Sequence, residues 1–178
     1  MVINNCYYLP MRLLLSLLLF LTITSIPLMA EDIGVHKKVP LSQSEPLLQT
    51  IEYGAMHMGT GDRKVYLFID PLCPHSQDLI ELISSNEKVL SRNSYYIYLY
   101  TLKRLHSERV VNAIYMSKNP LRSLFDVMIK KEKIDLEVKS NQDVLSKIEA
   151  IENVAQQLDV YKRPYLIFTK KPKNKRGH

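Results

Sequence analysis

The stretch VYLFIDPLCPHSQDLIELI, residues 65–83, decides the fold. It overlaps a short continuous apolar run, Lys64–Asp70, which is typical of a β-strand buried on both faces. Pro71 ends this strand, and Pro74 stands where a helix begins, because proline suits the first helical turn. Apolar residues then recur at helical spacing to about residue 90: Leu79, Ile80, Leu82, Ile83 and Leu90. The stretch predicts a buried strand that leads into a helix, with Cys73 at the junction.

Outside this junction, upstream residues predict one more helix. Ser42 with Glu45 has the pattern of a capping box, and Pro46 suits a first turn. We expect a short helix from Ser42 to about Met56, stopped by the sequence GTGD at 59–62.

Downstream residues continue the alternation of strands and helices. Residues 94–101 are rich in strand-forming side chains, and residues 164–169 predict a third strand. Helical patterns lie between them at about 107–117, 120–131 and 142–158, and Asn141 opens the last of these. Strands separated by helices imply a parallel sheet with helices on its faces, so the predicted fold class is α/β.

Composition limits the kinds of protein this chain can be. Its 178 residues are 46% hydrophobic and 24% charged, as in one soluble domain that buries a core. Two cysteines exclude a disulfide-stapled miniprotein and a Cys-rich zinc module. The net charge is +6, but five of the 24 basic side chains lie in a basic tail, residues 170–178. The positive charge is therefore mostly a tail effect, and we expect no nucleic-acid partner.

The first thirty residues predict a targeting segment. Residues 1–30 contain no Asp or Glu and one basic residue, Arg12, followed by an apolar run at 13–30. This is typical of a secretory signal peptide, and an uncleaved membrane anchor through 13–30 is the alternative. Export would place the rest of the chain, including Cys73, where disulfides can form.

Cys73 is the candidate for chemistry. A sulfur at a helix start faces the positive end of the helix dipole and free backbone N–H groups, which favour the thiolate, the form that attacks disulfides. His75 adds a second stabilising group. The alternative is that a lone cysteine is a small buried hydrophobe. Elsewhere, Met56-His57-Met58 could bind copper, but three adjacent helical residues point in different directions, so we expect a partly buried Met pair and no metal or cofactor.

With the strand, the Asp-Pro turn and the Cys-Pro helix start in place, the sequence resembles the thioredoxin superfamily, and within it the periplasmic disulfide isomerases of DsbC and DsbG type. The resemblance covers about residues 47–169 and includes a helical insertion, NAIYMSKNPLRSLFDVMI, at 112–129. It implies a thioredoxin-like sandwich at 61–169, preceded by an N-terminal segment at 31–60. It also implies a cis-proline loop in which Arg163, Pro164 and Tyr165 face Cys73 and bind the substrate backbone.

The sequence departs from that family in three places. Ser76 replaces the second, resolving cysteine of the Cys-Pro-x-Cys motif, so one chain cannot run a dithiol cycle. Arg163 replaces a Thr or small apolar residue, and either favours the thiolate of Cys73 or is a solvated surface arginine. Only nine residues follow Thr169, so we expect a truncated C-terminus. The surface thus left bare would be covered by residues 31–53 or, as we expect, by a second chain, because that segment is short and polar.

Two functions follow from these features. The first is an exported, periplasmic monothiol protein that exchanges or isomerises disulfides of exported clients, with Cys73 as nucleophile and His75 tuning it beside Pro74 and Ser76. The alternative is a non-catalytic thioredoxin-like module that binds or assembles an envelope complex. A homodimer or an envelope protein partner fits either function.

Overall fold

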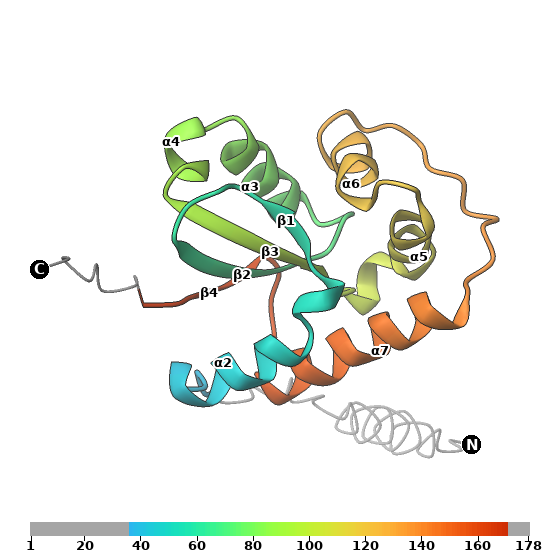
Figure 1. Cartoon of the computed structure of the whole chain (residues 1–178). Helices are drawn as coiled ribbons and strands as arrows, with labels where there is room; N and C mark the ends of the chain where they lie inside the picture. Colours follow the sequence, from blue (N-terminus) through green and yellow to red (C-terminus); the bar gives the residue numbers. More distant parts are fainter. Residues whose placement is uncertain (1–35, 171–178) are drawn as a thin grey trace, which may run out of the picture. The chain divides into compact units, whose positions relative to one another are not determined.

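Four strands form one mixed sheet in the order β1-β3-β2-β4 in the computed structural model, which describes residues 36–170 (Figure 1). The strands are β1 (Met56–Met58), β2 (Arg63–Ile69), β3 (Asn93–Leu99) and β4 (Tyr165–Phe168). The α-helices are α2 (Leu41–Thr50), α3 (Pro74–Ser84), α4 (Glu87–Leu90), α5 (Glu108–Met116), α6 (Pro120–Met128) and α7 (Gln142–Gln157). Short 3-10 turns, η1 (Glu52–Gly54) and η2 (Lys103–Leu105), precede β1 and α5.

The apolar run that predicts the first strand forms the centre of the sheet. β2 pairs with β3 on one side and β4 on the other, and its residues 65–69 are fully buried. Helices α3 and α4 lie on one side of the sheet, and α2 and α7 on the other (Figure 1). This arrangement confirms the α/β fold class, and α5 and α6 form the predicted helical insertion between β3 and α7.

The prediction of a parallel sheet is wrong in part. β2 and β3 are parallel, but β1 and β4 are both antiparallel to their neighbours. β4 begins beside the end of β2, where the carbonyl of Arg163 meets Cys73, so the chain enters β4 from the opposite end. Three helices separate β3 from β4, so the connection is not the single crossover that joins parallel strands.

Several predicted boundaries also differ. α2 begins at Leu41 with Pro40 as N-cap, so the Ser42–Glu45 capping box does not form, and the Ser44 hydroxyl donates to the Pro40 carbonyl instead. The helix ends at Thr50, and the residues expected to close it, 56–58, form β1. The helix expected from Pro74 to about 90 stops at Ser84, because Asn86 caps the separate helix α4. Asn141 caps α7 as predicted.

The N-terminal segment covers part of the core itself. Leu48 and Ile51 are fully buried in the same cluster as β2 and β3. The ring of His36 stacks on Tyr161 and lies 3.1 Å from Asp159. The described part of this segment, residues 36–53, therefore packs against the core, and the expectation that a second chain covers the remaining bare surface stays a prediction. Within residues 36–170, β4 is an edge strand, and Phe168 is 46% exposed there.

Glu52 ties this segment to the sheet. Its Oε1 accepts a hydrogen bond from Lys64 Nζ at 2.8 Å and another from the Tyr66 hydroxyl at 2.6 Å. Burial acts to raise the pKa of Glu52, but the hydrogen bonds from Lys64 and Tyr66 outweigh it and lower the pKa below its usual value. The ionised carboxylate thus stabilises the folded chain.

We expect Glu52→Ala to lower the free energy of unfolding by about 1–3 kcal/mol, because it leaves the buried Tyr66 hydroxyl without an acceptor. A carboxyl with a lowered folded pKa stabilises above its unfolded pKa, and this contribution is lost as pH falls through the folded pKa. Urea unfolding at neutral and acidic pH should therefore show the gap between wild type and variant shrinking in acid. A gap that grows in acid would contradict this, and the exposed Glu81→Ala is the matched control.

Candidate functional site

Cys73 sits at the N-cap of α3, as the sequence predicts. Its backbone N–H donates to the Asp70 carbonyl at 3.1 Å, and its own carbonyl accepts from the Gln77 N–H at 3.0 Å. The thiol Sγ donates to the carbonyl of Arg163 at 3.7 Å. Cys73 is the free cysteine of the described residues, and it is only 1% exposed. The turn after β2 therefore holds the sulfur at a helix start, directly against the segment that leads into β4.

That segment is the one predicted to face Cys73. The peptide bond between Arg163 and Pro164 is cis, and Pro164 and Tyr165 are half-buried. Tyr165 opens β4 and pairs with Phe68 of β2, and its ring meets the edge of Tyr161 at 6.0 Å. The structure therefore brings Cys73, Arg163 and Pro164 together across a gap of some ninety residues in sequence.

The guanidinium of Arg163 is buried beneath this segment. Its nitrogens donate to four backbone carbonyls, those of Tyr100 at 2.7 Å, Thr101 at 2.9 Å, Val160 at 3.0 Å and Lys162 at 3.2 Å. It also lies 3.7 Å over the Tyr100 ring. Burial lowers the pKa of Arg163, and Tyr100 and Asp70 act in the opposite direction. With 8% of its surface exposed, the alternative of a solvated arginine is wrong.

Asp70 belongs to the site, although no sequence pattern predicts a role for it. It is fully buried at the end of β2, and its Oδ1 accepts from the Leu72 N–H at 2.8 Å. Its Oδ2 accepts from the Leu102 N–H and from the Ser107 hydroxyl, both at 2.6 Å. Asp70 thus fixes the turn before Cys73 and the loop after β3. The signal that could have identified Asp70 is that it is a single acidic residue at the end of an apolar strand.

The other residues of the motif differ in exposure. Ser76, which we predict to replace a resolving cysteine, is fully buried, and its Oγ accepts from the Asp70 N–H at 3.4 Å. Pro74 and His75 are exposed in the first turn of α3. Within residues 36–170 no hydrogen bond joins the His75 ring to Cys73, so a tuning role for His75 stays a prediction.

The Met-His-Met segment lies in a strand and not in a helix. Met56 and Met58 are 6% and 8% exposed and belong to the core, while His57 points to the surface. The predicted buried Met pair is confirmed, although the alternation comes from the strand. In the described part of the chain no three His, Cys, Asp or Glu side chains cluster as metal ligands. No helix between residues 36 and 170 could span a membrane, and the predicted targeting segment, 1–30, lies outside that range.

Solved structures with a similar fold include a disulfide interchange protein, a periplasmic thioredoxin-like protein and a DsbG. A disulfide interchange protein from Neisseria gonorrhoeae is 20% identical, with a TM-score of 0.51 over 65% of this chain and 80% of its own. A periplasmic thioredoxin-like protein from Salmonella enterica serovar Typhimurium is 13% identical, with a TM-score of 0.57 over 74% and 86%. DsbG from Helicobacter pylori is 15% identical, with a TM-score of 0.52 over 72% and 61%.

No protein-family model and no curated protein matches the sequence. The likeness to these structures therefore shows the fold. Sequence identities of 13–20% do not show a shared activity. The chain has a thioredoxin-like α/β fold.

Proposed function

We propose that this protein is an exported monothiol thioredoxin-like protein that exchanges or isomerises disulfides of periplasmic client proteins through Cys73. One observation carries the proposal: the Cys73 sulfur lies at the start of α3, within hydrogen-bond distance of the carbonyl that precedes Pro164. A helix start favours thiolate, and thiolate is the attacking form. Two proteins of similar fold, a disulfide interchange protein and a DsbG, support the same chemistry.

The reaction needs one sulfur and no cofactor. The Cys73 thiolate attacks one sulfur of a client disulfide, so a mixed disulfide forms and the other client sulfur leaves as thiolate. A different client thiolate then attacks the mixed disulfide, which forms a new client disulfide and returns the Cys73 thiolate. No net oxidation occurs, and the client has exchanged its pairing. Ser76 cannot resolve the intermediate, because a hydroxyl does not displace a disulfide sulfur.

Each neighbouring residue has a distinct role in this proposal. Pro164 and Tyr165 pair with the backbone of the client segment beside the scissile disulfide. Arg163 is a positioning residue, because its guanidinium holds the loop and its carbonyl faces the thiol. His75, exposed next to Cys73, stabilises the thiolate when protonated.

The burial of Cys73 favours a second function. A thiol that is 1% exposed is what a non-catalytic binding or assembly module would contain, with the cysteine as a small core residue. In that case the segment at Pro164 would bind a partner, and the sulfur would only pack against it. Covalent trapping of clients separates the two functions.

We expect Cys73 to accumulate in mixed disulfides with exported proteins, because Ser76 leaves the intermediate unresolved. Non-reducing gels of the tagged Cys6→Ser protein should show slower bands that collapse with reductant and vanish in Cys73→Ala. Ser76→Cys should weaken the bands by supplying a resolving thiol. The control is Cys73→Ala with Ser85→Cys, which places an exposed thiol after the end of α3. Equal bands from that control would show that any thiol suffices.

A further inference from the structure

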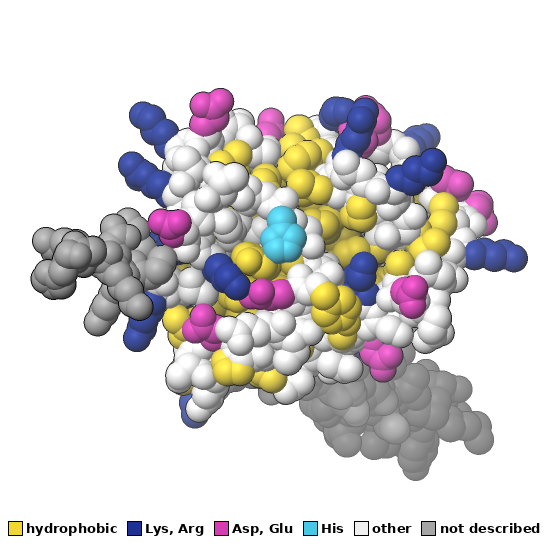
Figure 2. All heavy atoms as spheres, in the orientation of Figure 1, with side chains coloured by type: hydrophobic (Ala, Val, Ile, Leu, Met, Phe, Trp, Pro, Cys, Tyr) yellow, Lys and Arg dark blue, Asp and Glu magenta, His cyan; other side chains and the backbone are white. Residues whose placement is uncertain are grey.

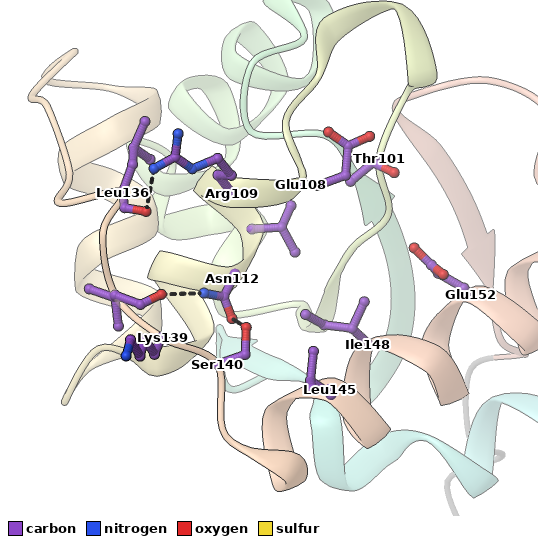
Figure 3. Close-up of a pocket in the computed structure, with 12 residues that line it drawn as sticks. Thr101, Glu108, Arg109, Asn112, Leu136, Lys139, Ser140, Leu145, Ile148 and Glu152 are labelled. Carbon is purple, nitrogen blue, oxygen red and sulfur yellow. Dashed lines mark hydrogen bonds between the residues drawn. The ribbon is translucent and has the colours of Figure 1, made fainter.

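A groove outside the Cys73 site lies between α5, α7 and the loop that joins α6 to α7 (Figure 3). Its volume is about 510 Å3, within the usual range for ligand sites. Its apolar wall contains Val111 of α5 and Ile148 of α7. Cys73 does not line it, so the groove belongs to a different part of the molecule.

The outer wall of the groove is held in place by side chains of α5. Arg109 Nη2 donates to the Leu136 carbonyl at 3.0 Å and to Glu137 Oε1 at 2.5 Å. Asn112 Nδ2 donates to the Val138 carbonyl at 3.0 Å, and its Oδ1 accepts from the Ser140 hydroxyl at 2.6 Å. These hydrogen bonds hold the loop against the helix and fix the outer wall of the groove. The charge of Arg109 is already paired with Glu137.

The rim of the groove is apolar and exposed. Leu136 on the loop is 38% exposed and Leu145 on α7 is 47% exposed. In Figure 2, hydrophobic side chains show at the surface among charged ones on the side of the molecule that carries α5, α6 and α7. Exposed apolar side chains on a rim are typical of a site for a partner that extends beyond the groove. They are less typical of a site that encloses a small ligand.

One end of the groove carries two carboxylates. Glu108 of α5 and Glu152 of α7 lie toward the end marked by Thr101, and Leu145 and Ile148 lie further along (Figure 3). Among the described residues neither carboxylate takes part in an ion pair. Burial raises the pKa of Glu152, and the nearby Glu108 and Glu149 add to the effect. A cation placed at this end would offset that repulsion.

We propose that this groove binds a polypeptide segment of a partner protein in which a Lys or Arg is flanked by apolar residues. The basic side chain lies at Glu108 and Glu152, and the apolar side chains contact Leu145, Ile148 and Leu136. The exposed apolar rim favours a polypeptide as the occupant. The two carboxylates, Glu108 and Glu152, favour a basic side chain in that polypeptide. This binding is independent of Cys73 and of disulfide exchange.

Selection from a random dodecapeptide library tests the proposal. The immobilised full chain selects binders, and the double variant Glu152→Gln, Leu145→Ser removes those that bind elsewhere. We expect enrichment of Lys or Arg within two positions of Leu, Ile, Val or Phe. In fluorescence anisotropy, Glu152→Gln or Leu145→Ser alone should raise the Kd of the enriched peptide by about fivefold or more. Replacing the peptide's basic residue with norleucine should have the same effect.

Controls separate the groove from the rest of the surface. Glu81→Gln and Leu82→Ser make the same kinds of change on exposed positions of α3, and Cys73→Ala removes the thiol. All three should bind the peptide as wild type does. A library with no enriched sequence, enrichment of acidic sequences, or equal weakening by the α3 variants would overturn the proposal. Loss of binding in Cys73→Ala would also overturn it, because the groove would then depend on the Cys73 site.

Discussion

Arg163→Ala should lower the free energy of unfolding by about 3 kcal/mol or more, because four backbone carbonyls lose their charged donor at once. It also removes the contact with the Tyr100 ring and leaves a space beneath the Pro164 loop. Urea unfolding followed by circular dichroism measures the change. The expected loss is large because the guanidinium joins the end of β3 to the start of β4.

Two further variants identify the cause of that loss. Arg163→Lys keeps the charge but offers a single ammonium to carbonyls on two separate segments, so it should recover little of the stability. Lys162→Ala changes the exposed neighbour and should stay within about 0.5 kcal/mol of wild type. If Arg163→Lys were as stable as wild type, positive charge and not the planar set of donors would be what the loop requires.

Asp70→Ala should be comparably damaging, with a loss of about 3 kcal/mol, because it leaves three donors without their acceptor in a buried site. Asp70→Asn is the sharper variant. Its amide can still accept from the Leu72 N–H, but its NH2 group would then face the Leu102 N–H. We expect a loss of about 1–3 kcal/mol for Asn by the same urea measurement. An Asn variant as stable as wild type would show that the charge and the second acceptor are unnecessary.

The local parts of the fold could be predicted from the sequence. The residues 64–83 carry their own signals, an apolar run, two prolines and helical spacing, and the structure places β2, Cys73 and α3 there. Asn141 begins α7 for the same reason, since its side chain accepts from the Val144 N–H within one turn. Contacts between residues that are close in sequence produce local patterns, and a single sequence is enough to recognise these patterns.

Features that depend on distant contacts could not be predicted in this way. β1 has three residues, too few for alternation to be distinguished from a helix end, and only its pairing with β3 defines it. The carbonyls that bind Arg163 include those of Tyr100 and Thr101, some sixty residues earlier. The partners of Asp70, Leu102 and Ser107, lie 32 and 37 residues further along the chain. The direction of β4 likewise depends on the end of the sheet at which the chain re-enters it after α5, α6 and α7.

The most direct test of a nucleophilic Cys73 is its alkylation by iodoacetamide in the native protein, in a Cys6→Ser background where it is the remaining thiol. If the start of α3 stabilises the thiolate, the folded protein should react at neutral pH about tenfold faster than the same protein unfolded in urea. Mass spectrometry follows the modified fraction with time. Reaction that occurs only as fast as the chain unfolds would contradict this, and would make Cys73 a buried core residue.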